Sequence, residues 1–339
     1  GGSKVQIGGP AGAYIVIVYN IVTQYGIDGL IISTILAGVL LFLMGLLKWG
    51  TLIRFVPVSI VIGFTNGIAV LIVLSQIKDI LGLKIDKLPA DFLPKAVTLF
   101  EHLNTANLAA IALSAASLGV LFIWPMIVKK TGMRALQYIP GSIIVLVGGA
   151  AAVSLMHLPV ATIGTQFGGI SSTLPAFVVP HIDLTIIHNL IRPAITIAIL
   201  GAIESLLCAR VADGLIGDRH DPNQELMAQG IANVAAPMFG GYSATGTIAR
   251  TVTNIRVGGR TPMAGMIHAL TLFVIIVAAA PLAKGVPLAT LRAILLFVAY
   301  NMGEWHEFIR LWKFSNNYRM ILLATFFLTV VADLTVAIE

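Results

Sequence analysis

Charged residues are scarce in this sequence. Of its 339 residues, 11% are charged and 58% are hydrophobic, and the mean hydropathy is +0.95. Soluble domains carry about 25% charged residues, so this chain cannot cover a globular surface with polar groups. Its apolar runs are also too long and continuous for a transmembrane β-barrel, which needs alternating segments of about ten residues. The composition therefore predicts an all-α polytopic membrane protein that uses lipid as much of its solvent.

Cysteine and the usual enzyme motifs are lacking too. The single cysteine, Cys208, excludes an intrachain disulfide. There is no P-loop and no G-x-G-x-x-G, and after His306 and Glu307 the place of a second zinc-ligating histidine holds Arg310. No nucleophile is paired with a base. The sequence predicts neither an enzyme nor a metal site, and no cofactor beyond Na⁺ or H⁺ as a coupling ion.

Apolar windows bounded by charge, Pro or Gly define the membrane segments. They cover 11–25, 29–47, 56–81, 106–128, 135–156, 186–209, an amphipathic 223–238, 247–256, 261–283, 287–301 and 318–338, the last broken near Asp333. Gln76, near the end of its segment, is expected at the interface. The chain starts at Gly1 without Met and stops inside an apolar run, so we expect it to be a piece of a longer protein.

The basic residues sort by side when these segments alternate across the membrane. One face collects most of the loop cations, namely Lys48, Arg54, Lys129, Lys130, Arg134, Arg210, Arg219, Arg256, Arg260, Arg310, Lys313 and Arg319. Cytoplasmic loops carry an excess of Lys and Arg, so this face is predicted to be cytoplasmic. The net charge of +6 thus reflects membrane orientation and does not indicate nucleic-acid binding.

Two short segments, 8–26 and 242–259, begin with small residues and end on glycine. A helix of 10–15 residues covers only about half of the ~30 Å hydrocarbon core. Paired, Gly-interrupted short segments are typical of transporters built from inverted repeats, and their helix N-termini bind anions. The alternative is that the small residues only allow close helix packing.

Two ionisable residues favour the functional alternative. Arg250 lies in the second short segment and Glu204 lies within a long span. Ionisable groups inside a membrane are costly and mark functional sites. Arg250 would attract an anion, and Glu204 would tune the site or carry a proton. The other interpretation is a structural ion pair between the two.

The stretch 202–270 resembles the signature region of the sulfate permease (SulP) family of anion transporters. It reads AIESLLCARVADGLIGDRHDPNQELMAQGIANVAAPMFGGYSATGTIARTVTNIRVGGRTPMAGMIHAL, and stretches 1–19, 53–83, 298–305 and 329–339 match the family in the same order. The resemblance implies a seven-plus-seven inverted-repeat fold with half-helices at the third and tenth segments meeting at mid-membrane. By that pattern the first two segments and the end of the last are absent here.

The family pattern also implies domains and site residues. The core domain falls on 1–50 and 185–283, the gate domain on 51–156 and 286–339, and the connection on 157–184, with a cytoplasmic STAS domain expected in the full protein. The third-segment N-terminus falls on Gly9, Pro10 and Ala11, the tenth on Thr247, Ile248 and Ala249 followed by Arg250, and the eighth-segment carboxylate on Glu204. Some members have serines at the positions of Thr247 and Ala249, so at Ala249 only the backbone N–H is expected to contribute.

These expectations describe a secondary active transporter of sulfate, bicarbonate or a dicarboxylate, coupled to H⁺ or Na⁺, that works by alternating access. Its partners would be the anion and membrane lipids, with a homodimer as a candidate assembly and no nucleic acid. Two alternatives stay open from the residues alone. One is an anion-binding sensor or scaffold without net transport, and the other is an anion channel.

Overall fold

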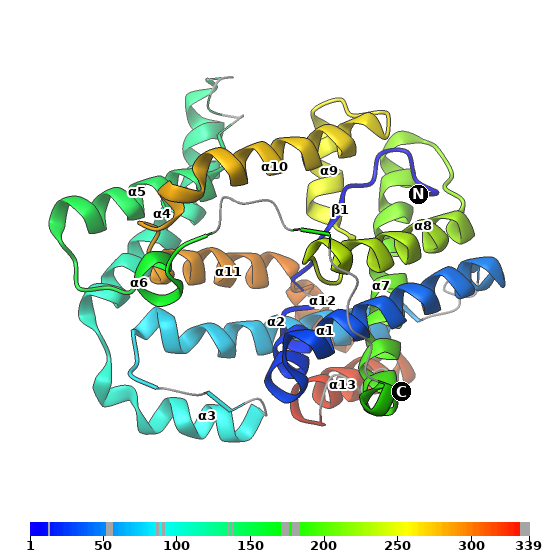
Figure 1. Cartoon of the computed structure of the whole chain (residues 1–339), viewed down its shortest axis with the longest axis horizontal. Coiled ribbons are helices and arrows are strands. Elements are labelled where there is room, and N and C mark those ends of the chain that lie inside the picture. Colours follow the sequence, from blue (N-terminus) through cyan, green and yellow to red (C-terminus); the bar gives the residue numbers. More distant parts are fainter. Residues whose placement is uncertain are drawn as a thin grey trace. The chain divides into compact units, whose positions relative to one another are not determined.

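The computed structural model describes residues 1–12, 14–51, 57–85, 88–89, 92–133, 136, 139–170, 176–177 and 184–332. Most of this part of the chain is helical (Figure 1). The α-helices are α1 (Tyr14–Leu46), α2 (Val58–Leu81), α3 (Phe92–Glu101), α4 (Leu108–Thr131), α5 (Gly141–Met156), α6 (Ile163–Phe167), α7 (Leu184–Ile216), α8 (Pro222–Ala235), α9 (Ile248–Arg256), α10 (Met263–Ala283), α11 (Leu288–Met302), α12 (Trp305–Ile309) and α13 (Asn316–Phe327).

The remaining elements are short. Two-residue strands β1 (Gly8–Gly9) and β2 (Thr245–Gly246) form one antiparallel sheet, and 3₁₀ turns cover Leu103–Thr105, Ala236–Phe239 and Leu311–Lys313. The helix of α13 passes into a π-helical turn at Leu328–Ala332. Asp333, where a break was predicted, lies outside the described residues.

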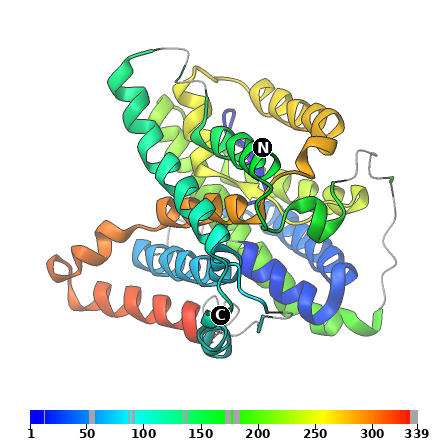
Figure 2. The same cartoon turned by 90° about the vertical axis from the view of Figure 1, so that its left-hand side faces the viewer.

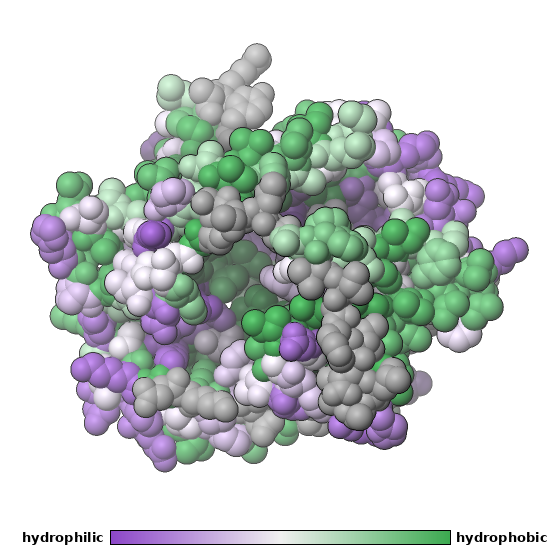
Figure 3. All heavy atoms as spheres, in the orientation of Figure 1, coloured by the Kyte–Doolittle hydropathy of each residue, from purple (hydrophilic) through white to green (hydrophobic). Residues whose placement is uncertain are grey.

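Five of the described helices are long and apolar enough to cross a membrane, namely α1, α2, α4, α10 and residues Ile187–Ile216 of α7. Large apolar side chains are widely exposed, as Figure 3 shows for one face. On α10, Met266 is 63% exposed and Leu270 is 62% exposed. Such surfaces are stable in contact with lipid, so the prediction of a multi-pass α-helical membrane protein is confirmed.

The chain divides into two compact units. The first consists of Gly1–Phe64, Pro175–Phe273 and Arg310–Glu339, and the second of Thr65–Leu174 and Val274–Ile309. Compactness does not report which parts move together, so the predicted core and gate domains stay a prediction.

In the first unit α1 packs along α8 and α7. Glycines bring the α1 and α8 backbones together, because a Cβ on Gly38 would lie 2.8 Å from Gly230 O, and a Cβ on Gly230 would lie 2.5 Å from Phe42 N. Small residues at such crossings are typical of helix packing in membranes.

α1 is not one continuous helix. Gly26 has φ 71° and ψ −171°, which interrupts it between residues 25 and 27. The positive φ is accessible to glycine without strain. The sequence predicted a short segment ending near residue 25 and then a full-length span. The break at Gly26 divides α1 in this way.

In the second unit α11 crosses α4, and both contact α5 (Figure 2). Arg292 of α11 lies 2.8 Å from Asp79 of α2, measured from Nε to Oδ2, and its Nη1 donates to Gln76 Oε1 at 3.2 Å. Among the described residues the Arg292 Nε–H makes no hydrogen bond. Its contact with Asp79 is therefore an ion pair in which the N–H does not point at the carboxylate oxygen. Gln76 is only 2% exposed. The side chain therefore accepts this bond inside the unit, and its position at the membrane interface stays a prediction.

Candidate functional site

The two short helices begin on either side of a miniature sheet. In the antiparallel pair β1–β2, Gly8 is opposite Gly246 and Gly9 is opposite Thr245. One strand leads into α1 and the other into α9. Because the strands are antiparallel, the two helix N-termini flank the sheet. Segments about 240 residues apart in the sequence thus meet at one place in the first unit.

The chain before α9 unwinds as predicted. Gly240 ends the preceding 3₁₀ turn in the left-handed conformation (φ 71°), and no helix resumes before Ile248. α9 has nine residues, about 13 Å at 1.5 Å per residue, less than half of a ~30 Å hydrocarbon core.

The N-terminal amides of α9 are left without partners. The Thr247 hydroxyl does not cap the helix, because it donates to Ile7 O (2.9 Å), as does the Thr247 N–H (3.0 Å). Within the described part of the chain, no hydrogen bond engages the N–H groups of Ile248, Ala249 or Arg250. All three residues are exposed. Such groups carry the partial positive charge of a helix N-terminus and can bind an anion.

The start of α1 faces the same sheet. Pro10 has no N–H, and those of Ala11 and Gly12 make no hydrogen bond to any described residue. Ala13 lies outside the described residues. Tyr14 is 1% exposed and donates from its hydroxyl to Ile197 O of α7 at 3.3 Å, which anchors the first turn of α1.

Arg250 joins the two helix starts. Its Nη2 donates to Pro10 O at 3.1 Å. Gly9 has φ 154°, and a Cβ there would lie 2.5 Å from Arg250 Nη1. The guanidinium therefore lies against the Gly9–Pro10 backbone, where only a glycine leaves room for it. The predicted residues 9–11 and 247–250 are brought together.

Glu204 is on α7 next to Ser205, whose Cα would lie 3.2 Å from a Cβ on Gly246 of β2. Its Oε2 is buried and has no hydrogen-bond partner among the described residues. The ion pairs of the described residues do not include one between Glu204 and Arg250. The alternative of a structural ion pair is therefore wrong for this conformation, and Arg250 keeps its charge for another use.

Buried polar side chains that the sequence did not single out hold α9 in place. Thr251 is fully buried; its hydroxyl accepts from Ile7 N (2.9 Å) and from Cys208 Sγ (3.2 Å). Asn254 donates to Val5 O at 2.9 Å. In the sequence these residues look like ordinary polar positions of an amphipathic helix, and nothing in their spacing marks them.

A second polar network joins α7 to α8. Glu225 is 3% exposed and accepts from Ser205 Oγ (2.9 Å) and from Ser3 N (3.2 Å). Ser205 Oγ in turn accepts from Gln6 (2.9 Å) and Gln229 (3.2 Å). The residues before β1 are thus tied to α8 by a charge-assisted hydrogen bond from Ser3 N, and to α7 by a neutral one from Gln6. Charge-assisted hydrogen bonds are the stronger kind.

Closer to the chain start, Lys4 donates to Asp218 at 2.9 Å, outside the spans. This hydrogen bond, with the Arg219 N–H and the Lys4 charge, holds the pKa of Asp218 below its usual value.

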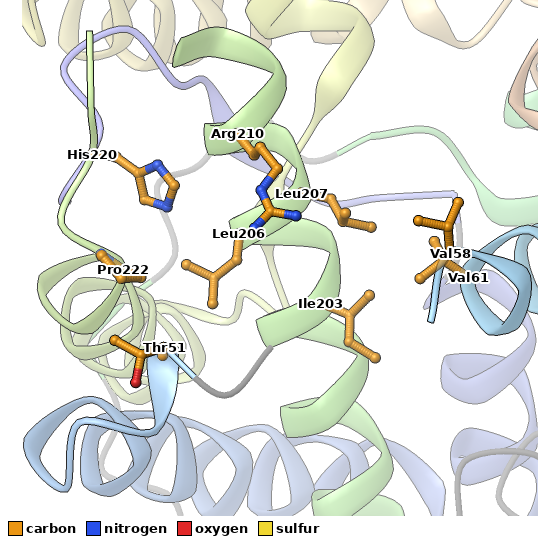
Figure 4. Close-up of a pocket in the computed structure, with 10 residues that line it drawn as sticks. Thr51, Val58, Val61, Ile203, Leu206, Leu207, Arg210, His220 and Pro222 are labelled. Atoms are coloured by element: carbon orange, nitrogen blue, oxygen red, sulfur yellow. The ribbon is translucent and has the colours of Figure 1, made fainter. Parts of the chain in front are cut away.

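A cavity of about 250 Å³ lies elsewhere in the first unit, and Figure 4 shows its lining side chains. Arg210 and His220 lie on one side of it, and Val58 and Val61 of α2 on the other. The His220 ring is 2.7 Å from Asp213 Oδ2. None of the predicted site residues lines this cavity.

Known proteins are similar to this chain in sequence and in fold. The family model described as "Sulfate permease family" matches residues 1–325. A putative sulfate transporter, YvdB of Bacillus subtilis, is 41% identical over the whole chain, which covers 62% of that relative. A bicarbonate transporter, BicA of Synechocystis, is 31% identical, again over the whole chain and 59% of the relative. The chain thus spans about three fifths of the length of these curated relatives.

Solved structures agree. The transmembrane domain of a cyanobacterium bicarbonate transporter BicA is 28% identical, with a TM-score of 0.87 over 99% of this chain and 85% of that one. SLC26A9 has a TM-score of 0.88 over 100% of this chain and 56% of that one, at 19% identity, and supports the fold alone. Sequence, fold and the family model together show that this chain belongs to the sulfate permease family.

Proposed function

We propose that this chain carries the anion-binding membrane domain of a secondary active transporter for a small oxyanion or carboxylate in the bacterial plasma membrane. The observation that carries the proposal is the pair of helix N-termini on one small sheet, with unpartnered N–H groups at Ile248, Ala249 and Arg250 and the Arg250 guanidinium held against Pro10 O. Helix N-termini and guanidinium groups both favour an anion.

In this proposal the anion lies between the starts of α1 and α9. Backbone groups around Gly9, Pro10 and Ala11 line one side, and those of Thr247, Ile248 and Ala249 line the other. Arg250 supplies a full positive charge. Recognition through backbone amides and one guanidinium suits sulfate, bicarbonate and dicarboxylates alike, so the chemical class is an anion with two or more oxygens.

Alternating access would arise as the predicted core (1–50 and 185–283) moves against the predicted gate (51–156 and 286–339). The relatives named as transporters support this class of function. A cytoplasmic STAS domain and a homodimer are proposed for the full protein.

Arg250→Ala tests the site. We expect sulfate or bicarbonate uptake into proteoliposomes to fall at least tenfold, because the guanidinium held against Pro10 O is lost. Arg256→Ala is the matched control, since Arg256 is an exposed residue in the last turn of the same helix. Undiminished uptake by folded Arg250→Ala protein would contradict the proposal.

The same assay separates the other functions. Binding of sulfate or bicarbonate without uptake would indicate a sensor or scaffold, and unitary currents without dependence on a H⁺ or Na⁺ gradient would indicate a channel.

Glu204 is proposed to couple transport to H⁺ or Na⁺, because its Oε2 is buried without a hydrogen-bond partner in the described part of the chain and the neighbouring Ser205 lies beside Gly246 of β2. Glu204→Gln should abolish the dependence of uptake on the driving gradient while leaving downhill flux. Glu304→Gln, at an exposed position outside the spans, serves as the control. Wild-type uptake that ignores both pH and sodium gradients would overturn this assignment.

A further inference from the structure

α3 (Phe92–Glu101) has a covered side, on which Lys95 and Leu99 are buried, and an exposed apolar side. On the inner side Leu99 is 4% exposed and packs in a cluster with Leu83 and Ile85 of the preceding loop. On the outer side Leu93 is 62% exposed, Val97 55% and Phe100 76%. These three positions are spaced four and three residues apart, so they form one stripe along the helix.

The loop that contains α3 is held at one end of two membrane spans. Asn107 N, at the start of α4, donates to Leu81 O, at the end of α2, at 2.8 Å. Lys84 N donates to Thr105 Oγ1 at 3.0 Å. α2 and α4 are both candidate spans, so the segment between residues 81 and 107 leaves and re-enters the membrane at nearly the same point. α3 runs beside the second half of α2 (Figure 1).

The leaflet follows from charge. The opposite end of α4 carries Lys129 and Lys130 in its last turn. Lys84, Lys87 and Lys95 lie on the α3 side, but over all loops the face that includes Lys129 and Lys130 collects most of the cations. Since cytoplasmic loops carry the excess of Lys and Arg, that face is predicted to be cytoplasmic and α3 to lie on the other side.

An apolar stripe of this kind is unfavourable in water, because each fully exposed large side chain forgoes the free energy of burial. A helix at the end of two spans can bury such a stripe in the headgroup and acyl-chain boundary, as amphipathic interfacial helices do. Glu101, exposed beside the stripe, would remain at the water side. We propose that α3 is an interfacial helix of the non-cytoplasmic leaflet, with Leu93, Val97 and Phe100 inserted among the lipids. It would anchor the second unit to the bilayer surface independently of the spans.

The test uses nitroxide labels on single cysteines introduced by Leu93→Cys, Val97→Cys and Phe100→Cys in the full chain, reconstituted into phosphatidylcholine–phosphatidylglycerol liposomes. Native Cys208 is fully buried, and labelling of the unsubstituted chain measures its background. Asn104→Cys, exposed in the next turn, is the control for a water-facing position. Collisions with oxygen report lipid, and collisions with a water-soluble nickel chelate report water.

We expect the three stripe labels to collide several-fold more with oxygen relative to nickel than the Asn104 label does. High nickel accessibility at all three stripe positions would show that the stripe faces water and would overturn the proposal. Low accessibility to both reagents would show that protein, such as a second copy of the chain, covers the stripe, which would also overturn it. Three independent labels keep the test valid if one variant fails to fold, and it does not depend on transport.

Discussion

Replacing Gly9 by alanine is expected to disable the proposed anion site without unfolding the protein. Gly9 has φ 154°, a region that residues with a Cβ avoid at a cost of about 1–3 kcal/mol. The new Cβ would lie 2.5 Å from Arg250 Nη1, so the guanidinium must move away from Pro10 O. For an exposed arginine we take that hydrogen bond as about 1 kcal/mol.

The two effects sum to about 2–4 kcal/mol, which lowers the population of the intact site between about 30-fold and about 1,000-fold, at ~1.4 kcal/mol per factor of ten. The apparent affinity for the anion falls by the same factor, because only the competent population binds. The measurement is the concentration dependence of labelled sulfate and bicarbonate uptake in proteoliposomes.

Gly8→Ala is the matched control. A Cβ on Gly8 would lie 3.6 Å from Thr245 O, an ordinary contact, and Gly8 is not in the left-handed region. The Gly8→Ala protein should take up sulfate and bicarbonate with nearly the apparent affinity of the unsubstituted chain. The reasoning is refuted if folded Gly9→Ala protein has the same apparent affinity as Gly8→Ala protein.

Two further substitutions test the support of the site. Thr251→Val should lower the free energy of unfolding by about 1–3 kcal/mol, because the buried N–H of Ile7 loses its acceptor. The midpoint of thermal unfolding in detergent should fall clearly. An unchanged midpoint would contradict the assigned hydrogen bond. Gly230→Ala should destabilise by a similar ~1–3 kcal/mol, since its Cβ would meet the α1 backbone at Phe42 N. Gly214→Ala, with nothing within 4 Å, should leave the midpoint unchanged, and equal midpoints for the two glycine variants would exclude the close packing.

Much of the site could be predicted from the residues because its features are local. The glycines and hydroxyl residues between Gly240 and Thr247 cannot continue a helix through a membrane. A break in the helix and a new helix start could therefore be predicted from the sequence. Arg250 and Glu204 could be predicted as candidate site residues because ionisable residues inside apolar runs are rare and costly.

The buried polar hydrogen bonds could not be predicted from the sequence, because they join positions far apart in the chain. Gln6 is 199 residues from Ser205, and Thr251 is 244 residues from Ile7. A buried glutamate such as Glu225, at the start of an amphipathic helix, has the same sequence appearance as a solvated one. The bond between Gln76 and Arg292 could not be predicted for the same reason, because Arg292 lies on another helix.

The sequence by itself determined that the chain is a membrane protein of apolar helices, because composition and hydropathy decide which solvent the surface can face. It also determined where the two short helices begin, because glycine and proline act on the local backbone. Only the tertiary structure decided that these helices start from one sheet, that Arg250 lies against Pro10 and not against Glu204, and which face of α3 is left uncovered. Those facts depend on the pairing of distant segments, which packing selects and local propensity does not encode.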